Sequence, residues 1–444
     1  MIFNISEEDK IIKEYESHFE RLNKESPDRY IKNYFFTPIS IKTSEDYYPK
    51  ICDIFKKYRK YIKSKPALMR VDGLYDKVEK ITDAILCSYR LEKSGSHNEA
   101  RDKIKNIIKE NIDSAFFVSD LDSSYSFRAI APFQDMRTQG IDYSEQNSYP
   151  LSFFRIRQVK NEDSKKEWNR TDLLHPPFNI VKKINSERFG LNGVPCLYLG
   201  TTTYCCYNEL GNKVPFYVSA YRPNNKGKKY KILNLTINTN TINGFDYNPY
   251  KPMSQIVQEM WVLYPLVMAT SVINPDKNKN ETQNDVNANN INMTLERPEY
   301  IISRLVMECL DELDIDGVAY LSTRINDPFR FPYSVNLAIP AYKKLEGTEY
   351  GEICTGFDMT DPILVGDRDF EHWKFNSNEE AIHFRSYLNA IYAGHHDEFH
   401  ATIESDSANG SVPNRRVYYD STPFSVLDDI LVGKKFDLAL KKGN

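Results

Sequence analysis

Residues 187–210, ERFGLNGVPCLYLGTTTYCCYNEL, combine a turn, a strand and a helix in one short stretch. The pair Asn192-Gly193 is typical of a tight turn, and the apolar run over 194–199 that follows it predicts a strand. Residues 201–210 predict a short helix that carries Glu209 near its end. This succession predicts that the surrounding region has a mixed α+β fold.

Further strands are predicted on both sides of this stretch, because short aromatic and β-branched runs alternate there with Gly, Pro and Asn. They begin after about residue 115. The clearest are FFRIR (153–157), PFYVSAY (215–221), YKILNLTI (230–237) and DIDGVAYLSTR (314–324). A capping-box spacing between Ser377 and Glu380 predicts one late helix that ends near Gly394.

The first 115 or so residues predict helices, because apolar side chains recur there at steps of three and four. Four such stripes cover residues 11–22, 47–62, 74–89 and 100–112. Four helices suffice for a small bundle, and their Lys- and Glu-rich faces are typical of solvated surface. The sequence therefore predicts an N-terminal helical domain over residues 1–115.

Composition argues against several classes of protein. The 444 residues carry 58 Lys and Arg against 62 Asp and Glu, a formal charge of −4, so no general affinity for nucleic acid is indicated. The N-terminus lacks the features of a secretory signal. The longest apolar run, 260–270, contains Pro265 and is shorter than the ~20 residues that cross a bilayer. We expect a cytoplasmic protein without a membrane partner.

No resident metal or cofactor is expected. The seven cysteines are scattered without C-x-x-C spacing, which argues against a disulfide framework and against a zinc–thiolate site. His395, His396 and His400 include one pair with helical spacing, but a surface tract is the better interpretation. Residues 275–294 are polar and Asn-rich, and they predict an exposed insertion.

Polar side chains inside apolar runs are the candidate functional residues, because burying them is costly unless they are paired or used. Five residues qualify: Arg155, Arg188, Tyr198, Glu209 and Ser322. Together they suit an anionic ligand that contains a ring, since arginines match phosphates, tyrosine stacks on rings and a carboxylate stabilises a developing cation. Singly, each has a plain structural reading as an ion pair, core residue, surface charge or turn residue.

The five residues belong to a pattern that resembles the RES domain, a family named for its Arg, Glu and Ser. The most specific block is R-F-x-x-N-G-x-P-x-L-Y-L from Arg188, with Glu209 about ten residues after it. Other matching stretches are FFRIR, LLHPPF, WVLYPLVMATSVI, ERPEYIISRLV and IDGVAYLSTR with NLAIP after it. The resemblance covers about residues 125 to 340 and suggests a catalytic domain over 116–345, followed by a C-terminal extension over 346–444 that packs on it or continues it.

The resemblance implies a fold similar to that of the ADP-ribosylating toxins, with a split, mixed β core whose cleft holds NAD as substrate. It implies a bacterial toxin, held by an antitoxin, that breaks the nicotinamide–ribose bond by hydrolysis or phosphorolysis. Transfer of ADP-ribose to a protein or nucleic acid is the alternative. A function outside the class of enzymes is also open. The chain could be a catalytically inactive binding module whose contacts are made by the helical domain.

The resemblance also implies a role for each candidate. Glu209 would stabilise the ribosyl cation, and Arg155 and Arg188 would grip the pyrophosphate. Tyr198 would pack on the nicotinamide ring. Ser322 would hydrogen-bond the ligand or orient Glu209.

Several assignments stay open at this point. Arg128 in SFRAIAP competes with Arg155 for the first family arginine, although FFRIR fits better because it directly precedes the HPPF block. Ser303 stands where many relatives would carry Gln, which puts a secondary contact in doubt. His175 lies in a rigid Pro-rich loop and is better interpreted as structural than as a cleft wall. Residues 1–115 could be a built-in antitoxin, a sensor or an element that forms a homo-oligomer.

Overall fold

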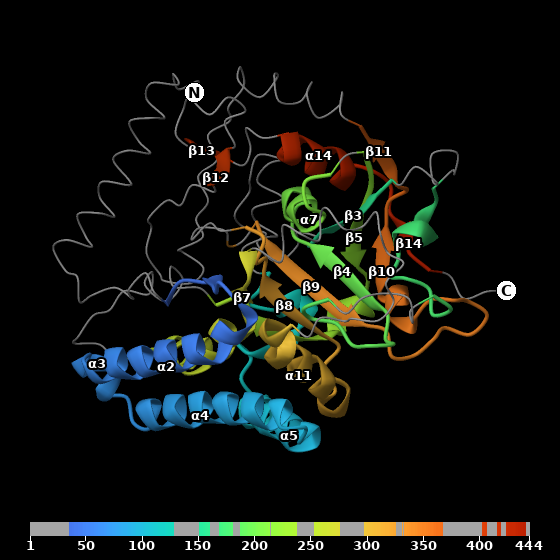
Figure 1. Ribbon diagram of the computed structural model, residues 1–444. Helices are drawn as coiled ribbons and strands as arrows, with labels where there is room; N and C mark the ends of the chain where they lie inside the picture. The colour runs from blue at the N-terminus through green and yellow to red at the C-terminus, as the bar shows by residue number, and fades with distance from the viewer. Residues whose placement is uncertain are drawn as a thin grey trace.

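The computed structural model describes residues 35–127, 151–159, 168–180, 187–213, 215–237, 253–275, 297–325, 331, 333–366, 402–405, 415–418 and 423–440. Within them one large mixed sheet has the strand order β14-β10-β5-β3-β4-β9-β8-β6-β2, and β11 also pairs with β5. The fold is therefore α+β, as the sequence predicts, with a helical N-terminal region (Figure 1).

The strands of this sheet are β2 (Val118–Asp120), β3 (Phe153–Gln158), β4 (Cys196–Gly200), β5 (Phe216–Pro223), β6 (Lys231–Leu235), β8 (Gly317–Leu321), β9 (Val335–Pro340), β10 (Phe357–Met359), β11 (Ile363–Val365) and β14 (Asp437–Leu438). Two small ladders join β1 (Ile39–Ser40) to β7 (Val272–Ile273) and β12 (Thr402–Ser405) to β13 (Arg415–Tyr418). The predicted strands at FFRIR, PFYVSAY, YKILNLTI and DIDGVAYLSTR are confirmed as β3, β5, β6 and β8.

The α-helices are α2 (Tyr47–Lys63), α3 (Pro66–Met69), α4 (Leu74–Lys93), α5 (His97–Glu110), α7 (Thr203–Glu209), α9 (Gln255–Thr270), α11 (Ile301–Cys309) and α14 (Pro423–Val432). Short 3₁₀ turns include η6 (Arg170–Leu173) and η9 (Pro298–Tyr300). Three predicted helical stripes are confirmed as α2, α4 and α5, and the fourth, 11–22, lies outside the described residues. No helix of the described part of the chain is long and apolar enough to cross a membrane.

The sheet is almost divided between β3 and β4. These strands meet at one residue pair, Phe154 with Gly200, whereas β3 pairs with β5 along its whole length. A continued antiparallel ladder would place Ile156 opposite Tyr198, but the Tyr198 carbonyl instead accepts a hydrogen bond from Arg155 Nη1 at 2.8 Å. A guanidinium thus replaces a backbone amide where the two halves separate.

Alternate residues of the central strands face different hydrophobic clusters, as the pleat requires. Cys196 on β4, Val318 on β8 and Ala338 on β9 pack in the cluster that includes α9 and α11. Their neighbours Leu197 and Leu337 face the opposite cluster. A third cluster lies under α7 and α14 over the β3–β5 half of the sheet, and Figure 1 shows these two helices at the opposite end of the strands from α11.

The N-terminal helices share one hydrophobic cluster with α9, α11 and the sheet. Ile51, Ile85 and Ile104 belong to it together with Trp261 and Val318. Three buried tyrosine hydroxyls add hydrogen bonds that join α9 to the segment 35–58: Tyr47 to Ala269 O, Tyr58 to Trp261 O and Tyr264 to Phe35 O. The domain limits at 115 and 345 stay predictions, but the described helices do not form an isolated bundle.

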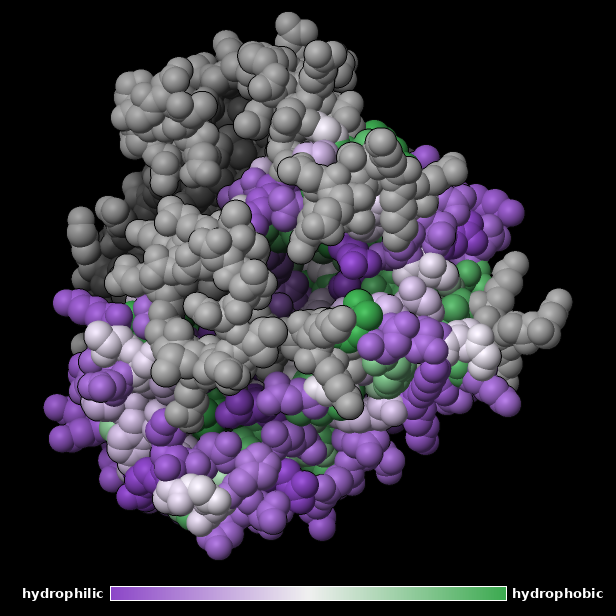
Figure 2. Space-filling model, turned by 45° about the vertical axis from the view of Figure 1, so that its right-hand side comes forward, coloured by the Kyte–Doolittle hydropathy of each residue, from purple (hydrophilic) through white to green (hydrophobic). Residues whose placement is uncertain are grey.

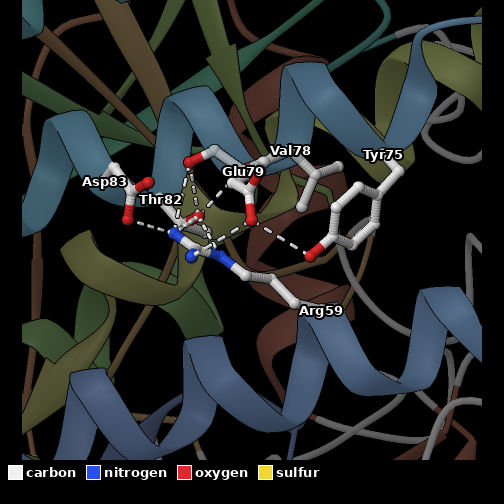
Figure 3. A network of polar contacts seen from close by, with 6 residues as sticks. All are labelled: Arg59, Tyr75, Val78, Glu79, Thr82 and Asp83. Carbon is white, nitrogen blue, oxygen red and sulfur yellow. Dashed lines mark hydrogen bonds and ion pairs between the residues drawn. The ribbon is translucent and has the colours of Figure 1, made fainter.

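A polar network joins α2 to α4 on the outer side of these helices (Figure 3). Arg59 Nε donates to Thr82 Oγ1 at 2.7 Å, and its guanidinium also pairs with Asp83. Tyr75 extends the network through its hydroxyl, which donates to Glu79 Oε1 at 3.1 Å. Figure 2 shows a mostly hydrophilic surface at the bottom of the view, where α4 and α5 lie. These helices therefore bury one face against the core and expose the other to solvent.

The shared cluster gives a first prediction. Ile104 on α5 is fully buried, so Ile104→Ala should lower the free energy of unfolding by about 3 kcal/mol through lost burial and a cavity. Circular dichroism and tryptophan fluorescence should report one coincident transition. The exposed neighbour Lys103→Ala should change stability by less than about 0.5 kcal/mol. A separate early transition of the helices would contradict the shared core.

Candidate functional site

The helix α7 is held by specific contacts at its N-terminal end. Thr202 is the N-cap: its hydroxyl oxygen accepts from Cys205 N at 3.0 Å and its hydroxyl donates to Tyr333 O at 2.5 Å. The next amide, Thr203 N, donates to the buried Asp428 carboxylate of α14 at 2.9 Å. A helix of only seven residues is thereby fixed against α14 and the segment that leads into β9.

Gly200 allows α7 to lie directly on the end of β4. A Cβ atom at this position would stand 2.7 Å from Cys206 Sγ, closer than nonbonded atoms approach. Cys206 Sγ in turn donates to Phe154 O at 3.1 Å. A larger residue at position 200 would therefore force the Cys206 side chain out of its contact with Phe154 O.

The structure brings Glu209 and Ser322 together. Glu209 Oε1 accepts hydrogen bonds from Ser322 Oγ and from Asn336 Nδ2, each at 2.6 Å. Both donors are buried, whereas the Glu209 side chain reaches solvent. Oε2 receives no hydrogen bond from any residue that the structure describes. The described part of the chain therefore holds one carboxylate oxygen through two buried donors and makes no hydrogen bond to the other.

Ser322 is oriented as a donor toward Glu209. It follows β8 directly, its amide donates to Ser334 O at 2.8 Å, and its Oγ accepts from Arg324 N at 3.2 Å. Because the backbone amide can only donate, the Ser322 hydroxyl proton is left for the Glu209 carboxylate. Of the two predicted roles for Ser322, the contact with Glu209 is the one present here.

Arg188 is built into the fold beside this group. Its Nη1 donates to Thr270 O at the end of α9, at 3.0 Å, and to Glu299 O at 3.3 Å. The guanidinium lies 4.6 Å from the centre of the Tyr300 ring, and the side chain is 8% exposed. Arg188 thus stabilises the junction between α9 and η9, and its grip on a pyrophosphate stays a prediction.

Tyr198 lies on the same face of the sheet as Asn336 and Tyr320. Its hydroxyl donates to Phe189 O at 2.9 Å, and a Cβ on Gly190 would come within 2.7 Å of that hydroxyl. Burial raises the pKa of Tyr198 well above its ordinary value, so the phenol stays neutral. The neutral ring remains partly exposed, which the predicted stacking on a ligand would require.

Arg155 occupies the division between β3 and β4 rather than the group around Glu209. By strand alternation its side chain leaves β3 on the same side as Phe153, whereas Phe154 faces the cluster under α7. Besides the Tyr198 carbonyl contact, its Nε is buried with no hydrogen-bond partner among the described residues. Its place in catalysis or phosphate binding stays a prediction.

Charged groups surround Glu187, which itself interacts with Glu209, and the sequence analysis singled out only Arg188 and Glu209 among them. Although Glu187 keeps contact with solvent, desolvation by the surrounding protein raises its pKa, and the Glu209 charge adds to this rise. Arg324, Arg297 and Arg188 act in the opposite direction. The pKa of Tyr320 is raised well above its ordinary value by burial first and by Glu209 next. Two carboxylates, three arginines and two tyrosines therefore interact electrostatically here.

Asn336 is the most direct contact that the sequence analysis missed. It lies in VNLAIP, an apolar strand, so the rule that selected the other candidates, a polar residue inside an apolar run, also applies to it. Tyr320 could be found only with the sheet register, which pairs it with Asn336.

The remaining sequence candidates take structural places or lie outside the described residues. Ser303 is buried and its hydroxyl donates to Tyr300 O at 3.0 Å within the first turn of α11. Arg128, the His395–His400 tract, the Ser377–Gly394 helix and all but the first residue of the 275–294 insertion lie outside the described residues. Within the described part of the chain, no group of three His, Cys, Asp or Glu side chains could hold a metal ion.

Comparison with known proteins finds a distant similarity to a protein described as a toxin. The chain is 25% identical over 262 residues to a protein described as "Putative toxin YopC" from Bacillus subtilis (strain 168). The match covers 57% of this chain and 54% of that protein, so the chain spans about half the length of this relative. No family model and no solved structure matches the chain. This similarity does not by itself identify a RES domain.

His175 is structural in this fold, as the sequence interpretation favours. Its Nδ1 lies 2.7 Å from Pro176 O and its Nε2 accepts from Gly351 N at 2.7 Å, so the neutral ring with its proton on Nδ1 satisfies both contacts. Burial lowers the pKa of His175 from 6.5 to about 4, opposed by the hydrogen bond to Pro176 and assisted by the Arg155 charge.

This burial predicts a pH dependence of stability. Between pH 6.5 and 4 the unfolded chain binds a proton that the folded chain does not, so the contribution of neutral His175 is complete above pH 6.5 and is lost as the pH falls. The loss should amount to about 3 kcal/mol. Chemical denaturation across this range should show a smaller decline for His175→Gln than for the wild type. Parallel declines would contradict the assignment.

Proposed function

We propose that this protein is a toxin that breaks the nicotinamide–ribose bond of NAD. The observation that carries the proposal is the Glu209 carboxylate, whose Oε1 is held by Ser322 and Asn336 on a side chain that is exposed. The resemblance to RES domains supplies the substrate. The similarity to a protein described as a toxin supports the toxin class.

The chemistry accounts for this arrangement. When the bond between C1 of the ribose and the pyridinium nitrogen breaks, nicotinamide departs as a neutral ring with the bonding electrons. Positive charge then develops on the ribose, and the Glu209 carboxylate would stabilise it. Attack by water, with loss of a proton, gives ADP-ribose, whereas attack by phosphate gives the phosphorylated sugar. The same cation could be captured by a protein or nucleic-acid acceptor.

Fixing the carboxylate in advance matters because a stabilising charge is effective only when it need not reorganise during the reaction. The same oxygen of Glu209 is bonded by Ser322, directly after β8, and by Asn336 on the adjacent strand β9. Tyr198 and Tyr320 on this face provide ring surfaces for the nicotinamide. The retention of all five family positions favours an enzyme over an inactive binding module.

The proposed NAD-depleting activity also suggests which partners the protein would have. An enzyme that depletes NAD in its own cell would need an antitoxin or another regulatory protein. The N-terminal helices, which share a core with the sheet, are the element on which such control could act.

The proposal predicts a selective loss of turnover in Glu209→Gln. The amide keeps the shape of the side chain and an oxygen that can accept from Ser322 and Asn336, but it lacks the charge. We therefore expect kcat for NAD consumption to fall on the order of 100-fold or more while KM changes little. Chromatography of products, with and without phosphate and with candidate acceptors, distinguishes hydrolysis, phosphorolysis and transfer.

The exposed Glu346→Gln provides a matched control with the same loss of charge, and it should keep wild-type turnover. Near-normal turnover in a folded Glu209→Gln protein would defeat the role of Glu209. A wild-type protein that leaves NAD intact would defeat the proposed function.

A further inference from the structure

Asn336 is a buried amide in an otherwise apolar strand. It is 5% exposed, and its neighbours along β9 are Val335 and Leu337. Burying an amide is costly unless its polar atoms are bonded. Here both ends of the amide contact α7: Nδ2 donates to Glu209 Oε1 at 2.6 Å and Oδ1 accepts from Cys205 Sγ at 3.2 Å.

The spacing of the two α7 residues explains this double contact. Cys205 and Glu209 are four residues apart, so they lie on one face of the helix, one turn from each other. Asn336 spans that turn from the adjacent strand. The amide therefore binds α7 in a single rotational setting, the one that brings Glu209 next to Ser322.

The chemistry of the partners fixes which end of the amide faces Glu209. A carboxylate only accepts hydrogen bonds, so the amide must present its nitrogen to it. Burial raises the pKa of Cys205 well above its ordinary value, so the thiol keeps its proton and can donate to the amide oxygen. A reversed amide would place oxygen against carboxylate and leave the thiol proton facing an NH₂ group.

We propose that Asn336 is a positioning residue for Glu209, and that Cys205 fixes the direction of its amide. This inference rests on the proposed function and deepens it. With Ser322 alone, the carboxylate could turn about its terminal torsion, which is broad in glutamate. Ser322 after β8 and Asn336 on β9 together hold one oxygen, and the other would be available to the ligand.

Asn336→Asp tests the inference through pH. At pH 8 two carboxylates would face each other, and we expect kcat to fall on the order of 100-fold. On acidification the pair can share a proton, which restores a donor to Glu209. The ratio of variant to wild-type kcat should therefore rise at least about tenfold between pH 8 and pH 5. Asn336→Ala, which has no donor at any pH, should show a loss without this rise.

Dividing by the wild-type kcat at each pH removes the pH dependence that both proteins share. The titratable and charged groups around Asn336 are Glu209 and Cys205 on α7, Tyr320 on β8 and Glu187 before β4, with the cations Arg324, Arg297 and Arg188 acting on Glu187. Circular dichroism confirms that each variant is folded before turnover is compared.

Cys205 provides a second test that adds no charge. Cys205→Ser keeps a donor to Asn336 and should retain kcat within about threefold, whereas Cys205→Ala should lose about tenfold in kcat with KM unchanged. Cys309→Ala removes another buried thiol, one bonded to Leu305 O in α11, and should keep wild-type kcat.

The outcomes separate the two claims. No NAD consumption by the wild type would overturn both the proposed function and this inference. An active wild type with a flat Asn336→Asp ratio across pH, or with equal kcat in Cys205→Ser and Cys205→Ala, would overturn the positioning role alone. A rise of the Asn336→Asp ratio on acidification together with rescue by Cys205→Ser supports it.

Discussion

The two hydrogen bonds that converge on Glu209 Oε1 are the constraint on which the site depends. They join the end of α7 to β8 and β9, whose donors lie 113 and 127 residues further along the chain. These two hydrogen bonds require α7 to be held in place. Three features hold it: the close contact that Gly200 allows, the Thr202 cap and the buried Asp428 carboxylate. A displaced α7 would lose both donors together, because both bind one oxygen.

The division of the sheet creates the setting for this helix. β3 and β4 share one residue pair, so α7 and α14 cover one half of the sheet while α9 and α11 cover the other. Glu209 and Tyr198 come from elements next to this division, and Arg155 bonds across it. Arg188 supports the second half by bonding the carbonyl at the end of α9, and its guanidinium packs against the Tyr300 ring.

Much of the fold is local enough to be predicted from the sequence. Apolar stripes predict α2, α4 and α5, and Asn192-Gly193 followed by an apolar run predicts β4, because periodicity and turn chemistry act over a few residues. The packing is not local. That the helices would share a core with α9, or that Tyr58 would bond the backbone at Trp261 203 residues away, follows only from the folded chain.

The candidate site also combines residues that the sequence could predict with contacts that only the folded chain shows. Residue type could select Glu209, Ser322 and also Asn336, but only the register of β8 and β9 places Tyr320 opposite Asn336. Arg188 shows the converse, since a buried arginine suited to phosphate is also suited to helix-end carbonyls.

The most direct measurement is a crystal structure of the protein with an NAD analogue whose nicotinamide ribose has carbon in place of the ring oxygen. A hydroxyl of that ring should lie within hydrogen-bond distance of Glu209 Oε2, with Oε1 still bound to Ser322 and Asn336. An analogue bound elsewhere, or a Glu209 released from both donors, would contradict the account.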